Sequence, residues 1–224
     1  IDAHAQRTGK KVMYAFNLTD EPAAMRRHHD VLVAHGATCA MMSLNSVGLA
    51  AAAEFRRHCA LPIHGHRNGW GMLTRCDALG VDFAAYQTLW RIAGVDHLHV
   101  SGLQNKFWEP DDSVVKSARA CLSPFPKPWP AWTVMPIISS AQWAGQAPMT
   151  YERVGSADLV YLCGGGIFGH PGGIAAGVRS VRQAWEAAMS GVSLERYAQE
   201  HRELREALAF FGERAAANAK KAPG

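Results

Sequence analysis

Histidines gather in two short segments whose residue types suit proton transfer. One is HGHR at positions 64–67, and the other is DHLH at positions 96–99. Histidine is the usual general acid or base near neutral pH, and the planar guanidinium of Arg67 pairs well with a carboxylate or a phosphate. These residues predict proton transfer on an anionic substrate, with His66 as the first candidate. For His64, a structural role in the core is an equal alternative.

The pair His97 and His99 has a second interpretation, because two imidazoles on one face of a strand end also bind zinc. The sequence offers no third ligand for such a site, so zinc is the minor alternative. Lys106 follows in a loop beside Phe107 and Trp108. Aromatic neighbours of this kind are typical of a loop that packs down over a site, and a solvated lysine is the alternative.

A glycine-rich segment, GGGIFGHPGG at positions 164–173, follows one apolar run and precedes a helical pattern. Backbone N–H groups of glycine can approach phosphate oxygens closely, and the N-terminus of a helix favours negative charge. The segment has the spacing of neither a dinucleotide-binding motif nor a Walker motif. It predicts a phosphate-binding turn, or else a turn that uses glycine only for tight packing.

The elements that must position these side chains alternate along the chain. Apolar runs with the length of strands lie at 11–18, 39–44, 61–66, 97–101, 132–138 and 159–163. Apolar residues at helical spacing lie at 21–35, 48–58, 83–93, 113–121, 174–189 and 193–211. Alternation of strands and helices predicts an α/β fold with a parallel sheet covered by helices.

The polar residues with possible functions follow the predicted strands at their carboxyl ends. They include Asn17, Asn45, 64–67, 97–101, Ser139, Ser140 and 164–166. That edge carries the active site of a (β/α)8 barrel and also the ligand of a doubly wound sheet. The clustering alone leaves both folds open, and it predicts that these side chains open into one anion-binding mouth.

Composition and charge argue against several other classes of protein. The 224 residues are 48% hydrophobic and 19% charged, and no apolar run has the length of a membrane span. The net charge of +4 comes from scattered basic residues, which does not favour a nucleic-acid surface. Five cysteines without a CxxC pair predict buried free thiols and a reducing cytoplasm. The first residues do not have the pattern of a signal peptide.

Five segments, in the same order, resemble the RuBisCO large-chain superfamily. HGHR at 64–67 is similar to the HxHR segment of that family's fifth barrel strand, and GVDHLHVSG at 94–102 is similar to its GGDHIHxG segment at strand six. Lys106 falls where the lysine of loop six is expected. PIIS at 136–139 resembles the PVAS segment of strand seven, and GGGIFGHP at 164–171 resembles the GGGTxGHP segment of strand eight.

This resemblance extends over about residues 11–191 and implies a (β/α)8 TIM barrel of a RuBisCO-like protein, form IV type. The six predicted strands match barrel strands three to eight. Strands one and two and an N-terminal α+β domain are therefore expected upstream. Residues 1–224 then form a partial catalytic barrel domain that ends in C-terminal helices at about 192–214.

The resemblance also implies catalytic roles. His66 matches a histidine that moves protons around an enediolate, and Lys106 matches the lysine that closes over the substrate and polarises the developing charge. His99 is placed with them in the catalytic set. The family's metal site, a carbamylated lysine with a nearby Asp and Glu, has no counterpart in these residues. A Mg²⁺ cofactor is therefore implied, with its ligands expected upstream of Ile1.

Phosphate-binding roles follow in the same way. Arg67, His99 and Ser139 match residues that surround one phosphate of a sugar bisphosphate. The backbone of Gly164 and Gly165 matches the donors for the other phosphate. The resemblance thus implies a phosphorylated sugar derivative as the substrate.

Three departures separate the chain from a true RuBisCO. Trp70 stands where the family's HRxxH pattern has its second histidine. Ser140 and Ala141 replace a Gly-Gly pair, which is expected to crowd a phosphate pocket. The loop LQNKFWEPDD at 103–112 differs from the family's TVVGKLEGE. These changes argue against carboxylase activity and for a RuBisCO-like enzyme.

The segments HGHRNGW and FWEPDD resemble proteobacterial RuBisCO-like proteins that act on 3-oxo-isoapionate 4-phosphate. The resemblance implies metal-stabilised enediolate chemistry, first of all decarboxylation of this branched β-keto acid phosphate. Alternatives are carboxyl transfer or hydrolysis of the same substrate, an enolase or isomerase acting on a thio-sugar phosphate, and a non-catalytic family member. We expect a cytoplasmic homodimer, or a multiple of dimers, without a nucleic-acid or membrane partner.

Overall fold

In the computed structural model, the described residues are 1–76, 78–105 and 109–219. They form two compact units. The first unit comprises Ile1–His99 and Cys121–Met135, and the second comprises Val100–Ala120 and Pro136–Gly224. Each unit combines parallel strands with helices, so the predicted α/β class is confirmed.

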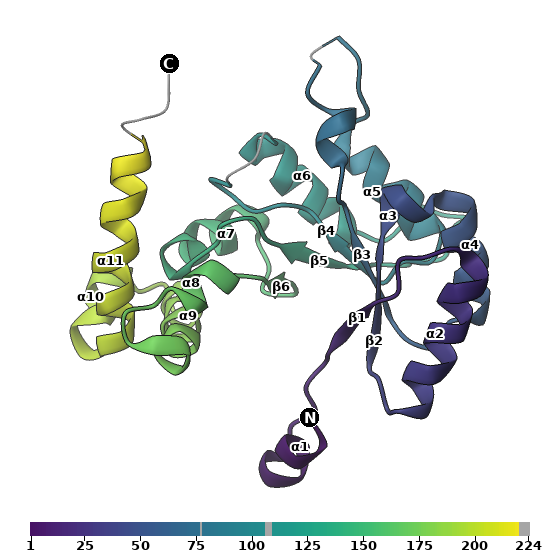
Figure 1. Cartoon of the computed structure of the whole chain (residues 1–224). Coiled ribbons are helices and arrows are strands. Elements are labelled where there is room, and N and C mark those ends of the chain that lie inside the picture. The colour runs from purple at the N-terminus through teal and green to yellow at the C-terminus, as the bar shows by residue number, and fades with distance from the viewer. Residues whose placement is uncertain (77, 106–108, 220–224) are drawn as a thin grey trace. The chain divides into compact units, whose positions relative to one another are not determined.

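Four parallel strands form the sheet of the first unit (Figure 1). They are β1 (Ala15–Asn17), β2 (Cys39–Ser43), β3 (Ile63–His66) and β4 (His97–His99). Neighbouring strands pair in sequence order, with Phe16 opposite Ala40, Ala40 opposite Ile63, and His64 opposite His97. Because the strands are parallel, their carboxyl ends lie at one edge of this sheet.

Helix α1 precedes the first strand of the first unit, and its other helices follow strands. The helices of this unit are α1 (Asp2–Thr8), α2 (Pro22–Ala34), α3 (Leu44–Val47), α4 (Leu49–His58), the short 3-10 helix η1 (Trp70–Leu73) and α5 (Phe83–Ile92). Helix α2 begins where the Glu21 carboxylate accepts hydrogen bonds from the backbone N–H groups of Ala23 and Ala24, with Pro22 in the first turn. The core beneath these helices is large and apolar, and includes Met25, Met42, Phe55, Ile63 and Leu98.

The second unit holds the rest of the described chain. Its elements are α6 (Asp111–Leu122), β5 (Met135–Ile138), η2 (Ala144–Gln146), α7 (Ala147–Val154), β6 (Val160–Tyr161), α8 (Gly164–Phe168), α9 (Gly173–Met189), α10 (Leu194–Glu200) and α11 (Arg202–Ala219). Strands β5 and β6 are parallel, with Ile137 opposite Val160. Residues 100–101 run beside β5, since Val100 N–H donates to Ile137 O at 3.0 Å and Ser139 N–H donates to Ser101 O at 3.2 Å.

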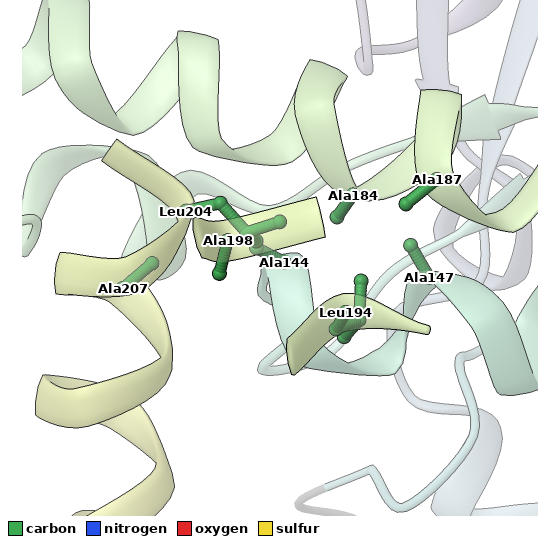
Figure 2. Close-up of a cluster of buried hydrophobic side chains, with 8 residues drawn as sticks. All are labelled: Ala144, Ala147, Ala184, Ala187, Leu194, Ala198, Leu204 and Ala207. Atoms are coloured by element: carbon green, nitrogen blue, oxygen red, sulfur yellow. The ribbon is translucent and has the colours of Figure 1, made fainter. Parts of the chain in front are cut away.

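Small side chains let the helices of the second unit pack closely (Figure 2). The cluster consists of Ala144, Ala147, Ala184, Ala187, Leu194, Ala198, Leu204 and Ala207, with larger rings such as Trp143 and Phe211 against it. The Glu203 carboxylate joins α11 to α9, because Arg179 Nε donates to it at 2.7 Å and Gln183 Nε2 at 3.0 Å. These contacts hold α9, α10 and α11 as one packed group.

All six predicted strands exist, and each is shorter than its apolar run. The predicted helix at 193–211 is two helices, α10 and α11, because His201 between them has an extended backbone with φ −124° and ψ 94°. The predicted glycine-rich turn is also different, since residues 164–168 form the short helix α8. Among the described residues, all five cysteines are free thiols, and four of them are buried as predicted. No helix in the described part is both long and apolar enough to cross a membrane.

Candidate active site

His66 is the last residue of β3, and the residue before it, Gly65, lies where the strand packs tightly against neighbouring side chains. A Cβ on Gly65 would lie 2.8 Å from Val95 Cγ1 and 3.0 Å from Leu44 Cδ1, so only glycine fits between these side chains. Residues alternate across a strand, which places His64 and His66 on the face opposite this contact. The HGH sequence thus serves one packed face and one polar face.

The polar face carries a histidine cluster formed by His64, His66, His97 and His99. The Nε2 atoms of His64 and His99 are 2.7 Å apart, and both side chains are buried. The ring centroids of His66 and His99 are 4.4 Å apart, and those of His64 and His97 are 5.8 Å apart. The structure therefore brings together two of the three predicted catalytic residues, His66 and His99.

Burial keeps the histidine cluster uncharged. Desolvation lowers the pKa of His64 to about 4, with smaller contributions from His97 and His66. Desolvation, followed by the charges of His66, His64 and Arg67, lowers the pKa of His99 to about 2. A neutral His99 acts through hydrogen bonds and not through charge, so the positive charge near it comes from Arg67.

His66 is more exposed than His64 and His99, which are both buried. Desolvation lowers its pKa, the hydrogen bond to Asn68 acts in the opposite direction, and the charge of Arg67 lowers it again. The ring is therefore neutral near pH 7 while a proton can still reach it. A histidine in this state can both accept and return a proton, as the sequence predicts for His66.

A chain of hydrogen bonds through amide and hydroxyl groups leads to the Nδ1 atom of His66. The His66 Nδ1 atom is hydrogen bonded to Asn68 Oδ1. Asn68 Nδ2 donates to Ser43 Oγ at 2.8 Å, and Asn45 Nδ2 donates to Asn68 O at 2.7 Å. Tyr86 OH in turn donates to Asn45 Oδ1 at 2.9 Å. The residues around His66 thus come from the ends of β2 and β3 and from α5.

Trp70, the first of the departures from RuBisCO, belongs to the core. It is buried, and its ring stacks on Phe83 with centroids 4.6 Å apart and meets Tyr86 at 4.4 Å. The residue at the place of the second RuBisCO histidine is thus an anchor that packs the loop after β3 onto α5. Because Tyr86 also bonds to Asn45, this packing supports the chain of hydrogen bonds around His66.

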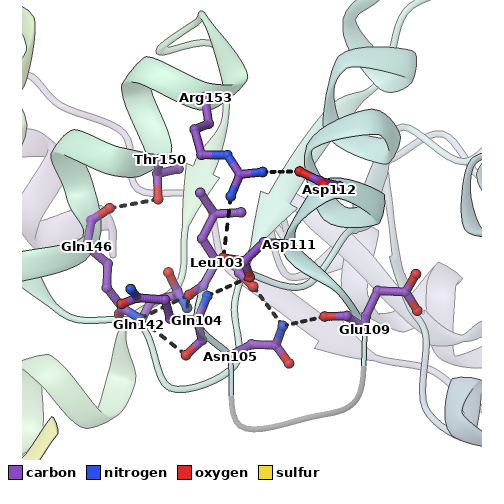
Figure 3. A network of polar contacts seen from close by, with 11 residues as sticks. Leu103, Gln104, Asn105, Glu109, Asp111, Asp112, Gln142, Gln146, Thr150 and Arg153 are labelled. Carbon is purple, nitrogen blue, oxygen red and sulfur yellow. Dashed lines mark hydrogen bonds and ion pairs between the residues drawn. The ribbon is translucent and has the colours of Figure 1, made fainter. Parts of the chain in front are cut away.

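Lys106, the third predicted catalytic residue, lies outside the described residues, but the segments that flank it are well anchored (Figure 3). Gln142 Nε2 and Gln146 Nε2 each donate to Leu103 O at 3.0 Å. Asn105 Nδ2 donates to Gly102 O at 2.9 Å and to Glu109 O at 3.1 Å. Side-chain amides therefore hold both ends of the loop that carries the predicted lysine.

Ser139, predicted to bind phosphate, is buried in the second unit directly after β5. It lies next to Gly102, because a Cβ on Gly102 would be 2.5 Å from Ser139 O. The two residues that replace the family's Gly-Gly pair have left-handed backbones, with φ 74° at Ser140 and φ 64° at Ala141. This is the conformation that glycine adopts without strain, so a non-glycine residue at either position carries Cβ strain.

The glycine-rich segment separates into two kinds of glycine. A Cβ on Gly164 or Gly165 would meet no atom within 4 Å, whereas one on Gly166 would lie 2.8 Å from Trp143 Cα. Tight packing therefore accounts for Gly166 but not for Gly164 and Gly165. The open space at these two residues fits the predicted approach of a phosphate to their backbone.

The described residues do not fit the Mg²⁺ that the family resemblance implies. Among them, the group of His, Cys, Asp and Glu side chains close enough to share an ion is His29, Asp30 and His58. Ala60 N–H donates to His29 Nε2 at 3.1 Å, so the neutral ring carries its proton on Nδ1 and donates it to Asp30 Oδ1 at 3.0 Å. Mg²⁺ also prefers oxygen ligands. The described residues therefore offer no set of ligands suited to Mg²⁺.

Sequence reasoning missed Asn68, Ser43 and the direct contact between His64 and His99. The signal for Asn68 was its place within HGHRN, two residues after His66, where a short polar side chain can turn back to the ring. The pairing of His64 with His99 follows from parallel register, which the sequence alone does not fix. The zinc alternative for His97 and His99 is not supported, because His99 Nε2 contacts His64.

The described residues thus place neutral, buried histidines and Arg67 at the carboxyl ends of parallel strands in an α/β fold. The sequence matches the ribulose bisphosphate carboxylase large chain, catalytic domain, over residues 1–211, and the chain belongs to this family.

Relatives within the family are RuBisCO-like proteins. The chain is 55% identical over 211 residues to a 3-oxo-isoapionate-4-phosphate transcarboxylase/hydrolase of Xanthobacter autotrophicus, covering 94% of this chain and 51% of the relative. It is 49% identical over 212 residues to a 3-oxo-isoapionate-4-phosphate decarboxylase of Rhizobium etli, covering 94% of this chain and 50% of the relative.

The solved structure of a rubisco-like protein from Burkholderia fungorum matches with a TM-score of 0.89 and 49% identity, covering 93% of this chain and 52% of that one. The chain spans about half the length of the curated relatives it matches, with 51% and 50% of two relatives covered. The fold of the described residues is therefore that of the RuBisCO-like family.

Proposed function

We propose that the protein is a carbon–carbon lyase that decarboxylates a phosphorylated branched β-keto acid, 3-oxo-isoapionate 4-phosphate or a close analogue. The names of relatives at 49% and 46% identity support this substrate and reaction. The structural observation that carries the proposal is the neutral, part-buried His66 next to Arg67 and His99, which suits proton exchange beside an anion.

The reaction needs one proton. As the bond between the carboxyl carbon and its neighbour breaks, its electron pair forms an enolate with the adjacent ketone, and CO2 leaves. The carbon then takes a proton from protonated His66, which regains one from solvent. A ring whose pKa is lowered by burial is a stronger acid when protonated, which favours delivery of the proton to carbon.

Three kinds of group bind the substrate in this proposal. Arg67 and His99 bind oxygen atoms of the anion, through charge and through a neutral imidazole respectively. Ser139 and the backbone N–H groups of Gly164 and Gly165 bind phosphate, and the open space beside these glycines supports that role. Lys106 stabilises the enolate charge, as the family resemblance implies.

Carboxyl transfer or hydrolysis of the same substrate is the second candidate, and the name of the relative at 55% identity supports it. In hydrolysis, water adds to the ketone carbon while neutral His66 takes up its proton; the bond from this carbon to the carboxyl-bearing carbon then breaks, and the carbon that leaves with the electron pair takes a proton. The two candidates differ in pH dependence. Decarboxylation uses protonated His66 and slows as the pH rises through the His66 pKa, whereas hydrolysis uses neutral His66 and slows as the pH falls.

For the whole protein, we propose that both units belong to one (β/α)8 barrel domain and that the protein acts as a homodimer, or a multiple of dimers, in the cytoplasm. The fold of the matched structure and the dimeric and octameric relatives support these proposals. We also propose that the protein uses Mg²⁺, held by ligands outside these 224 residues. Membership in the RuBisCO family supports this cofactor.

The test is to supply the full-length protein with 3-oxo-isoapionate 4-phosphate and to measure CO2 and the carboxyl-free product. We expect CO2 release with the wild type, with kcat lowered at least about 100-fold in Lys106→Met and His66→Gln. Lys11→Met, at an exposed lysine, is the matched control and should keep full activity. Turnover of a thio-sugar phosphate without CO2 release would favour the enolase alternative, and no turnover of either substrate would favour the non-catalytic one.

A further inference from the structure

We propose that Asn68 is a positioning residue that keeps the proton of the His66 ring on Nδ1, so that Nε2 is the atom that exchanges a proton with the substrate. The role of Nε2 rests on the proposed function, in which His66 is the proton carrier. The position of the proton on Nδ1 depends only on the contacts between the Asn68 and His66 side chains.

The orientation of the Asn68 amide decides which proton the ring carries. Asn68 Nδ2 donates to Ser43 Oγ at 2.8 Å, which turns the amide oxygen towards His66. An amide oxygen has lone pairs and no proton, so it can only accept. The hydrogen bond between His66 Nδ1 and Asn68 Oδ1 therefore requires a proton on Nδ1.

Nδ1 keeps this proton in both charge states of the ring. In the neutral ring Nδ1–H donates to Asn68 and Nε2 has a lone pair, and in the protonated ring both nitrogens carry a proton. Nε2 is thus the nitrogen that gains and loses the proton. This is the arrangement in which a neighbouring acceptor fixes the tautomer of a catalytic histidine.

The backbone of Asn68 is fixed as firmly as its side chain. Asn45 Nδ2 donates to Asn68 O at 2.7 Å, and Trp70 N–H donates to Arg67 O at 3.0 Å. Gly69 completes the turn with φ 76° and ψ 1°, values that the third residue of a type II turn requires. Asn68 is therefore held in place before any substrate arrives.

The charged and titratable groups that face His66 are Arg67, His99 and His64. The charge of Arg67 opposes protonation of His66. The rings of His99 and His64 are neutral, and they would oppose it only after gaining a proton themselves. None of the three accepts the Nδ1 proton in the described structure, so the tautomer depends on Asn68.

The experiment follows the histidine ring nitrogens by ¹⁵N NMR in the protein labelled at histidine, with His66 assigned from the spectrum of His66→Gln. Above the pKa of His66, we expect a protonated Nδ1 and an unprotonated Nε2. In Asn68→Ala the ring should populate the Nε2–H tautomer. In Asn68→Asp the Nδ1–H form should persist, and the His66 pKa should rise by about one unit because a carboxylate replaces the amide.

Kinetics separates positioning from a merely structural effect. Asn68→Ala should lower kcat about 10-fold or more while KM changes little, because the wrong tautomer weakens proton transfer. Asn68→Asp should retain most of kcat and move the His66 limb of the pH profile upward by about one unit. Gln199→Ala, which removes an exposed amide on α10, is the control and should alter neither spectrum nor rate.

A wild-type His66 with its proton on Nε2, or an Asn68→Ala variant with an unchanged tautomer and pKa, would overturn the assignment of Asn68. A changed tautomer in Asn68→Ala with an unchanged kcat would instead overturn the role of His66 as proton carrier while leaving the positioning by Asn68 in place. The two failures are therefore distinguishable, and circular dichroism of each variant checks that the fold is kept.

Discussion

His64 Nε2 and His99 Nε2 lie 2.7 Å apart within the core of the first unit. Two nitrogens at this distance form a hydrogen bond only if one of them carries a proton and the other has a lone pair. The pair therefore holds one proton between its two Nε2 atoms. A second proton there would break the bond and leave one buried imidazolium facing the N–H group of the other ring.

This pair predicts that the folded state is sensitive to mild acid. The folded pKa values, about 4 for His64 and about 2 for His99, lie below the ordinary value of 6.5. The unfolded chain thus binds more protons below pH 6.5, and the stability contributed by the neutral pair is complete above pH 6.5 and is lost as the pH falls towards 4. We expect the free energy of unfolding to be about 4 kcal/mol lower at pH 5 than at pH 7, about 2 kcal/mol for each ring.

Urea unfolding at a series of pH values measures this slope. His64→Gln removes one titrating ring and should flatten the slope between pH 7 and pH 5 by roughly half. His28→Gln, at an exposed histidine of α2, is the matched control and should leave it unchanged. An equal slope in wild type and His64→Gln would show that the pair does not determine the acid sensitivity.

The left-handed backbones of Ser140 and Ala141 predict that glycine is stabilising at these positions. Relief of the Cβ strain at φ 74° and φ 64° is worth about 1–2 kcal/mol per residue, and the greater freedom of glycine in the unfolded chain offsets part of it. We expect Ala141→Gly to raise the free energy of unfolding by about 0.5–1 kcal/mol. Ala131→Gly, at an exposed residue without positive φ, should lower it. A loss of stability in both variants would contradict the strain argument.

The glycines around α8 predict opposite effects of the same substitution. A Cβ on Gly177 would lie 2.3 Å from Ile167 O, so Gly177→Ala should separate α8 from α9 and cost about 1–3 kcal/mol of unfolding free energy. Gly165→Ala meets no atom within 4 Å and should not lower stability. If the Gly165 backbone binds the phosphate of the substrate, Gly165→Ala should nevertheless raise the KM for that substrate about 10-fold. An unchanged KM would remove Gly165 from the phosphate site.

The elements of the fold could largely be predicted, because each strand is an apolar run and each long helix has helical spacing. The strand lengths could not. Residues 11–14 belong to the first apolar run, yet they are exposed and precede the three paired residues of β1. Pairing with a neighbouring strand decides where a strand ends, and a single sequence does not contain that information. The break at His201 was missed for a similar reason, since no proline or glycine marks it.

The residue types of the candidate site could be predicted from the sequence, but the contacts between these residues could not. His66, Arg67 and His99 were evident from their spacing at strand ends. Their protonation states depend on burial and on partners distant in the chain, such as Ser43, which is 25 residues from Asn68. Hydrogen bonds of this kind follow from the register of parallel strands and from the turn at Gly69, so they appear only once the fold is known.

The packing of Trp70 predicts that restoring the RuBisCO-type histidine there would harm the fold. Trp70 is 3% exposed and stacks on Phe83, and the smaller, polar ring of histidine would leave a cavity and a polar atom in the core. We expect Trp70→His to lower the free energy of unfolding by about 3 kcal/mol, as other large-to-small core substitutions do. Trp129→His, at a tryptophan that is 57% exposed, should change it by less than about 0.5 kcal/mol.

If both variants unfold at the same urea concentration as the wild type, Trp70 is not the anchor of the loop after β3. If Trp70→His alone is destabilised and its His66 NMR signals also shift, the aromatic contact and the hydrogen bonds through Tyr86 and Asn45 act together on the proton carrier.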